Sequence, residues 1–130
     1  MEYVAVIAAA VASYAFGAIW YMVMAKPWVE ASGVEVDENG RPAGSSPMPF
    51  VISFISAVLV AGMMRHIFAL AGIDDVAKGV MAGAGLGLFI VTPWIATNYA
   101  FSSRPKNLTL IDSGYAAIGC TIMGIVLTLF

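Results

Sequence analysis

The stretch that decides the fold is "KGVMAGAGLGLFIVTPW", Lys78 to Trp94, in which glycine recurs at residues 79, 83 and 87. The run is apolar and carries no charge after its first residue, which indicates a helix in a membrane. Glycines four apart share one face of a helix and let a second backbone come close. They do not form a phosphate-binding loop, because no Lys-Ser/Thr pair follows them. The stretch predicts a tightly packed transmembrane helix.

Composition extends this prediction to the whole chain. Of its 130 residues, 61% are hydrophobic and 11% are charged, which is too little charge for a soluble globule of this size. Four apolar stretches are long enough to cross a bilayer, and they are continuous rather than alternating, which excludes a β-barrel. We expect an all-α membrane protein, an antiparallel four-helix transmembrane bundle in one domain. Its helices are expected near residues 3–25, 48–70, 76–101 and 108–130, with an extramembrane loop at 26–47.

The ends of the spans predict the orientation. The chain opens Met1-Glu2-Tyr3 with no basic residue before Lys26, so we expect the first span to be retained rather than cleaved as a signal peptide. Four basic residues follow the first and third spans, whereas two lie on the other side. Since basic residues accumulate on cytoplasmic connections, both termini are expected outside. The four are Lys26, Arg41, Arg104 and Lys106, and the two are Arg65 and Lys78.

The first connection carries its own local pattern. Its Asn39-Gly40 pair predicts a turn between short extended stretches at residues 34–36 and 41–43. Its acidic residues lack the alternate spacing of a calcium loop, so a solvated loop is expected.

Small residues recur every fourth position in all four spans, as expected where helices pack closely in lipid. Such stripes are common packing features and require no function by themselves. They are Ala5, Ala9, Ser13 and Gly17 in the first span; Ser53, Ala57 and Ala61 in the second; Gly79, Gly83 and Gly87 in the third; and Ala116, Cys120 and Gly124 in the fourth.

Extending these stripes brings polar and aromatic side chains to the end of the bundle that holds the first and third connections. Pro93 is expected to kink the third span just before them. Two interpretations remain open: an aromatic belt that anchors one leaflet and includes Trp28, or a pocket between helix ends floored by Gly17 and Gly87. The candidate pocket or partner-contact residues are Trp20, Tyr21, Phe50, Trp94, Asn98, Asp112 and Tyr115.

Arg65 lies on the packing face of the second span, below its end, where an unpaired charge is costly. Asp75 and Glu2 point into the same region, with Asp74 as a substitute. We predict a structural ion pair of Arg65 with Asp75 or Glu2. Snorkelling of Arg65 to the interface is the alternative.

Motifs for catalysis, metals and nucleic acid are absent from the sequence. His66 has no second histidine or cysteine pair near it, so neither a metal nor a pigment ligand is indicated. No nucleophile lies beside a histidine base, and the span centres carry no ionisable residue for proton-coupled transport. The net charge of −2 and the lack of a basic patch argue against nucleic acid. We expect no enzyme activity, no cofactor and no metal.

Three sets of residues resemble a known family. They are Gly17-x-x-Trp20-Tyr21 followed by Trp28, the glycine-rich third span ending in Trp94 and Asn98, and Asp112-x-Gly114-Tyr115. In this order they resemble the bacterial membrane protein family called domain of unknown function 1761, over nearly the whole chain. The resemblance implies a small four-span membrane protein of uncharacterised role and supplies no activity. Together with the distribution of basic residues, it leads us to expect the chain in the bacterial inner (cytoplasmic) membrane with both termini periplasmic.

Two functions are expected from these patterns. The first is a non-catalytic accessory or assembly subunit that packs against other membrane protein subunits, since so little of the chain lies outside the bilayer. The alternative is a binder or carrier of a lipid or small apolar ligand in the aromatic pocket, with Tyr21, Asn98 and Asp112 orienting its polar part.

Overall fold

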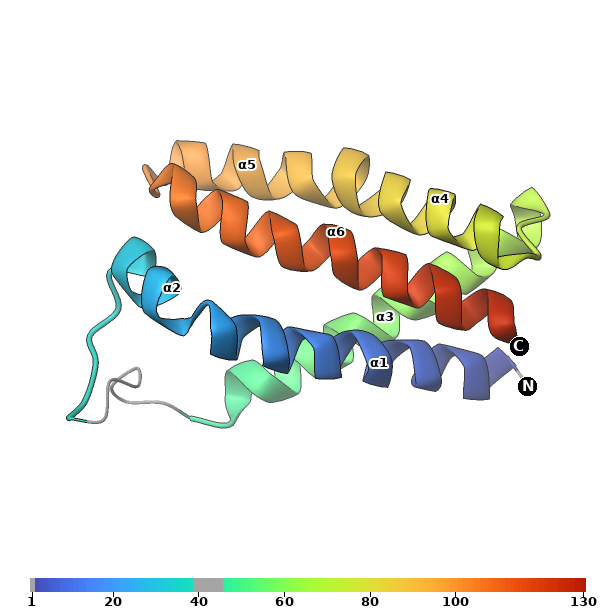
Figure 1. The fold of residues 1–130 in the computed structure, drawn as a ribbon, viewed down its shortest axis with the longest axis horizontal. Coiled ribbons are helices and arrows are strands. Elements are labelled where there is room, and N and C mark those ends of the chain that lie inside the picture. Colours follow the sequence, from blue (N-terminus) through green and yellow to red (C-terminus); the bar gives the residue numbers. More distant parts are fainter. Residues whose placement is uncertain (1, 39–45) are drawn as a thin grey trace.

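Four long apolar helices cross the molecule in alternating directions and form a bundle, the second of them inclined to the others, with the two chain ends at the same end of it (Figure 1). The computed structural model describes residues 2–38 and 46–130. Each of the four is long and apolar enough to cross a membrane. They are α1 (Glu2–Val23), α3 (Met48–Ala71), the third span Val76–Phe101 and α6 (Lys106–Leu129). The all-α fold expected from the sequence is confirmed, and the protein is a membrane protein.

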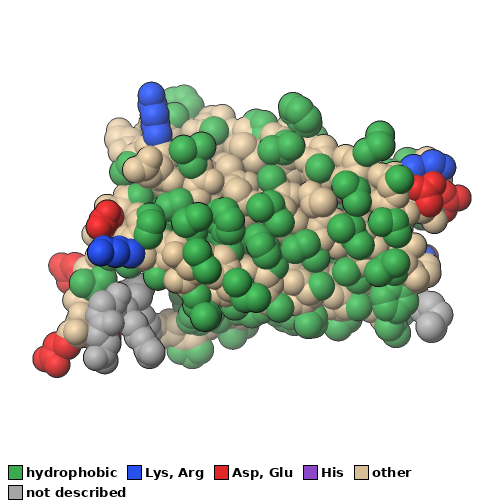
Figure 2. Space-filling view, in the orientation of Figure 1, with side chains coloured by type: hydrophobic (Ala, Val, Ile, Leu, Met, Phe, Trp, Pro, Cys, Tyr) green, Lys and Arg blue, Asp and Glu red, His purple; other side chains and the backbone are tan. Residues whose placement is uncertain are grey.

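The surface in Figure 2 divides as a membrane protein requires. Hydrophobic side chains cover the middle of this face, while acidic and basic side chains gather at its two ends. Side chains such as Met81 and Phe89 are 73% and 77% exposed because lipid, not protein, is their expected neighbour.

The first connection begins with a helix rather than a loop. The short helix α2 (Ala25–Ser32) follows α1 directly, and Gly33 ends it at φ 70°. Pro27 is accommodated near the start of α2, where a missing N–H breaks no helical bond. The expected loop at 26–47 is therefore wrong in its first residues. The predicted turn at Asn39-Gly40 and the stretch 41–43 lie outside the described residues.

The second and third spans are joined by a short connection with clear helix signals. Gly72, at φ 71°, ends α3, and its N–H bonds the Phe68 carbonyl. Asp75 then starts α4 (Val76–Leu86), because its side chain accepts a 2.8 Å hydrogen bond from the Lys78 backbone N–H.

The third span is interrupted by a wide π-helical turn. It consists of α4, η1 (Gly87–Val91) and α5 (Thr92–Phe101). In η1 the Thr92 N–H reaches back five residues to the Gly87 carbonyl, and the Thr92 hydroxyl bonds the same oxygen at 2.8 Å. Pro93 has no N–H and crowds the turn before it, so the bond pattern changes there. The wide turn holds one extra residue and rotates α5 relative to α4 by about 100°.

The glycine stripe of α4 meets the small-residue stripe of α6. A Cβ at Gly79 would overlap the Gly124 carbonyl oxygen, and one at Gly83 would overlap the Cys120 carbonyl oxygen. A Cβ at Gly87 would lie 2.6 Å from the Ala117 Cα. The two backbones are thus in direct contact, which side chains larger than glycine would prevent.

The remaining core joins α1 to α6 and α3. Its small residues are Ala5, Ala9, Ser13 and Gly17 on α1, and Ala57 and Ala61 on α3, all buried. Ser53, expected in the same stripe, is exposed. The reason is that α3 packs mainly on α1 and has only a small contact with α6. Among residues 46–130, α3 has no extensive contact with α5.

Candidate functional site

A carboxylate and two tyrosines join three helices near one end of the bundle. The Tyr21 hydroxyl on α1 donates a 2.6 Å hydrogen bond to Asp112 Oδ1 on α6. The Tyr99 hydroxyl on α5 donates to Asp112 Oδ2. We refer to Tyr21, Tyr99 and Asp112 as the Asp112 cluster. It fixes the ends of α1, α5 and α6 relative to one another.

Two further bonds strengthen this end. Trp20 Nε1 donates to the Ile111 carbonyl oxygen at 3.0 Å, and its ring lies over Gly114, where a Cβ would be 2.8 Å from Trp20 Cζ2. Arg104, in the connection before α6, donates to the Ser32 carbonyl oxygen at the end of α2 at 2.7 Å. The glycine at position 114 therefore makes room for the indole that ties α1 to α6.

Asn98 and Trp94, two of the expected pocket residues, point elsewhere. Asn98 is exposed and its side chain forms no hydrogen bond within the described parts of the chain, and Trp94 is 68% exposed. The wide turn in η1 is the reason: an added residue moves position 99 onto the face where an unbroken helix would place position 98. Tyr99 thus occupies the place expected for Asn98. The Thr92-Pro93 pair was the signal for such a break.

Of the other two candidate pocket residues, Tyr115 is packed inside the bundle and Phe50 is exposed. Tyr115 packs inside, stacked with Phe16 at a centroid distance of 6.2 Å and edge-on to Tyr21 at 5.4 Å. Phe50 is 66% exposed and contributes only its carbonyl, which accepts a 3.2 Å hydrogen bond from the Tyr14 hydroxyl. Trp28 is not only an interfacial side chain, because its ring meets Tyr21 edge-on at 6.5 Å.

The Asp112 cluster satisfies its own polar groups. A carboxylate within a membrane span is costly unless it is paired or hydrogen-bonded, and here both of its oxygens accept tyrosine hydroxyls. A ligand that binds Asp112 would have to share each oxygen with a tyrosine hydroxyl. The cluster is therefore arranged as a clamp between helices and not as an open binding site.

An open groove lies beside the clamp, between α3 on one side and α6 and η1 on the other. It has a volume of about 510 Å³ and is lined mostly by apolar atoms. Small side chains form its walls, including Ser53, Ser56 and Gly119. The Ser56 hydroxyl is exposed and forms no hydrogen bond with any residue in 2–38 or 46–130. We call this feature the α3 groove.

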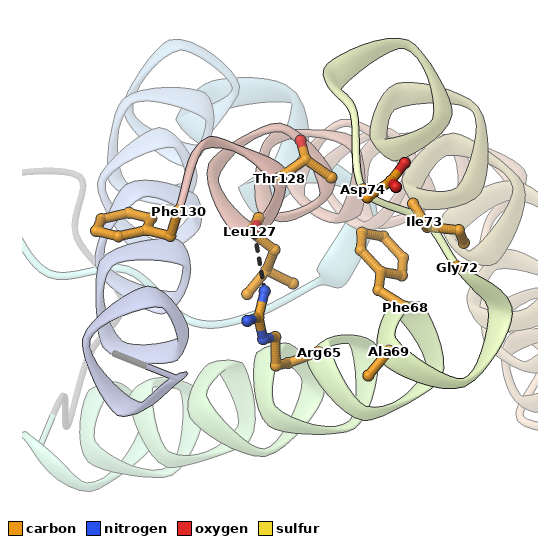
Figure 3. A pocket seen from close by; sticks show the side chains of 9 residues that line it. All are labelled: Arg65, Phe68, Ala69, Gly72, Ile73, Asp74, Leu127, Thr128 and Phe130. Atoms are coloured by element: carbon orange, nitrogen blue, oxygen red, sulfur yellow. Dashed lines mark hydrogen bonds between the residues drawn. The ribbon is translucent and has the colours of Figure 1, made fainter.

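The ion pair predicted for Arg65 is wrong. Arg65 Nη1 donates to the Leu127 carbonyl oxygen at 3.3 Å (Figure 3). Asp75 instead caps α4 and lies 3.8 Å from Lys78, while Glu2 is exposed at the start of α1. The last carbonyls of a helix lack partners and carry partial negative charge, so the end of α6 attracts the guanidinium.

Residues that could hold a metal are not gathered anywhere in the described ranges. No group of three or more His, Cys, Asp or Glu side chains comes together there. His66 is exposed, and Cys120 is a buried free thiol in the contact between α4 and α6.

Comparison with known proteins gives a family whose function is unknown. The family model described as "Protein of unknown function (DUF1761)" matches residues 4–128. No curated protein and no solved structure matches the chain.

Proposed function

From the premise that the chain belongs to the family of unknown function DUF1761, we propose that it is a non-catalytic accessory subunit of a larger membrane assembly. Its α3 groove receives one transmembrane helix of a partner protein. We place it in the bacterial inner membrane, with the connections α1–α3 and α5–α6 cytoplasmic and both termini periplasmic, in line with the basic residues found there.

The observation that carries this proposal is the hydroxyl of Ser56. It lies eight residues into α3, about 12 Å along the helix and so near the middle of the hydrocarbon, in a groove of apolar atoms. A hydroxyl without a partner is unfavourable in hydrocarbon, and an acyl chain offers it no acceptor. A polar side chain or a free backbone carbonyl of a neighbouring helix would provide the acceptor that the Ser56 hydroxyl lacks.

The shape of the groove supports the same occupant. Small side chains on both walls allow a helix backbone to approach closely, as they do between α4 and α6. Since α3 is held mainly by α1 and has few contacts with α6, the side of α3 that lines the groove has room for a partner helix.

The alternative of a lipid or apolar ligand in the aromatic pocket has less support. Tyr21 and Tyr99 occupy both oxygens of Asp112, and Asn98 points away, so the polar groups that were to orient a ligand are already engaged or displaced.

The proposal is tested by placing a phenyl ring in the α3 groove through a single substitution. Val60 lines the α3 groove, whereas the adjacent Leu59 is 68% exposed and does not line it. We expect Val60→Phe to release the protein from a larger complex on native gels of mildly solubilised membranes, while Leu59→Phe leaves the complex intact. Ser56→Ala, which keeps the groove open, is expected to weaken the complex by about 0.6 to 1.7 kcal/mol.

A diazirine side chain at Ser53 identifies the occupant. We expect an adduct with one protein, absent from a control at Met81 on the outer face of α4 and lost when Val60→Phe is added. Adducts of lipid mass alone at Ser53, or a protein that runs alone in every variant, would contradict the proposal. An adduct with a second copy of this chain would mean that the partner helix comes from a homo-oligomer.

A further inference from the structure

A second cavity lies at the opposite end of the bundle from the Asp112 cluster. It has a volume of about 270 Å³ and lies between the last turns of α3, the connection to α4 and the end of α6 (Figure 3). Arg65 forms one wall with Phe68, and Asp74 lies on the far side. We call it the Arg65 pocket.

No carboxylate of residues 2–38 or 46–130 neutralises the charge of Arg65. Arg65 Nη1 donates a hydrogen bond to the Leu127 carbonyl oxygen. Its Nε is shielded from solvent and has no hydrogen-bond partner in the described part of the chain. Asp74 does not serve, because its carboxylate pairs with Lys78 at 3.3 Å and its side chain is 79% exposed. One positive charge therefore remains within a transmembrane span, where it is costly without an anion.

The pocket lies at the helix ends, where the membrane interface is expected, because Gly72, Asp74 and Phe130 line it together with Arg65. Arg65 lies six residues before Ala71, the last residue of α3, and so about 9 Å below the helix end. Its long side chain extends toward the end of α6, as arginines near an interface do. The volume is smaller than the roughly 300 to 1,000 Å³ of pockets for drug-sized molecules, so the pocket suits a headgroup fragment rather than a whole lipid.

We propose that the Arg65 pocket binds a phosphate group, which the guanidinium recognises through paired N–H donors and charge. The phosphodiester of an anionic phospholipid and free inorganic phosphate share this chemistry. The inference does not depend on the proposed function, since the α3 groove and the Arg65 pocket share no residue.

The experiment compares binding of phosphatidylglycerol, phosphatidylcholine and inorganic phosphate to the purified full-length chain by native mass spectrometry. Arg65→Gln removes the charge but keeps an amide donor for the Leu127 carbonyl, whereas Arg65→Lys keeps the charge. Lys106→Gln, an exposed position at the other end, controls for the change in net charge.

We expect wild type and Lys106→Gln to prefer phosphatidylglycerol over phosphatidylcholine, and Arg65→Gln to bind it about tenfold more weakly. Arg65→Lys is expected to retain most of the preference. Retention of inorganic phosphate by the wild type and not by Arg65→Gln would also support the site and would assign it to a free anion. Equal binding of phosphatidylglycerol by wild type and a folded Arg65→Gln variant, with no phosphate retained, would overturn the proposal.

Discussion

The close contact between α4 and α6 predicts how much one added methyl group, introduced by a glycine-to-alanine substitution, changes the stability of the fold. Gly83 and Gly85 lie two residues apart in α4, yet a Cβ at Gly83 would overlap the Cys120 carbonyl oxygen and lie 3.0 Å from the Thr121 Cα, whereas a Cβ at Gly85 has nothing within 4 Å. Both changes to alanine bring the same gain in helix propensity, about 1 kcal/mol in water. The difference between the two variants therefore isolates the cost of separating the backbones.

We expect Gly83→Ala to be less stable than Gly85→Ala by about 1 to 3 kcal/mol, the usual cost of overpacking a close contact. The obstructing atoms belong to the α6 backbone and cannot turn away as a side chain can. At 1.4 kcal/mol for each factor of ten, the unfolded fraction should rise by roughly 5- to 150-fold.

The assay is unfolding in mixed micelles of mild and denaturing detergent, followed by tryptophan fluorescence, with size-exclusion chromatography to confirm that each variant begins folded. Gly85→Ala should equal or exceed the wild type in stability. If the two variants unfold within about 0.5 kcal/mol of each other, the inferred backbone contact between α4 and α6 is refuted, since surface substitutions commonly fall within that range.

Three further predictions concern the clamp and the orientation. Tyr21→Phe and Tyr99→Phe should each destabilise the fold by about 1.5 to 3 kcal/mol, and a double-mutant cycle should show that their costs are not additive, because both donate to Asp112; additive costs would contradict a shared carboxylate. Trp20→Phe should cost about 1 kcal/mol through the lost bond to Ile111, and Gly114→Ala should reproduce part of this loss by displacing the indole; an unchanged tryptophan emission in Gly114→Ala would argue against it. With Cys120→Ala as background, cysteines at Glu30 and Asn107 should react with an impermeant maleimide only from the cytoplasmic side, and one at Asp74 only from the periplasmic side; labelling of Glu30 and Asp74 from one side would exclude the proposed orientation.

The helices could be predicted from the sequence because each is marked by a local sequence pattern. Runs of apolar residues mark the spans, and glycine at position 72 with aspartate at 75 marks the turn between two of them. Glycines four apart also indicate a face for close packing, although which helix they meet is a property of the folded chain.

The candidate site was harder to predict because it depends on helical phase. Asp112 and Tyr21 lie on the faces expected for them, whereas the wide turn in η1 exchanges Asn98 for Tyr99. A single extra residue changes the direction of every side chain after it, and the sequence shows only Pro93 as a hint of where this happens. The prediction of an ion pair for Arg65 was wrong for another reason. Its partner is a backbone carbonyl at the end of α6, which a pattern of side chains cannot indicate.

The clamp also has a consequence for how the chain is made. Trp20 and Tyr21 bond residues that follow them by 91 positions. At about 5 to 20 residues per second of synthesis, the first span waits roughly 5 to 18 s for its partners on the last. Of the long helices made before α6, α3 is the one that packs extensively on α1, so until the last span is made α3 alone among them can shield the small-residue face of α1.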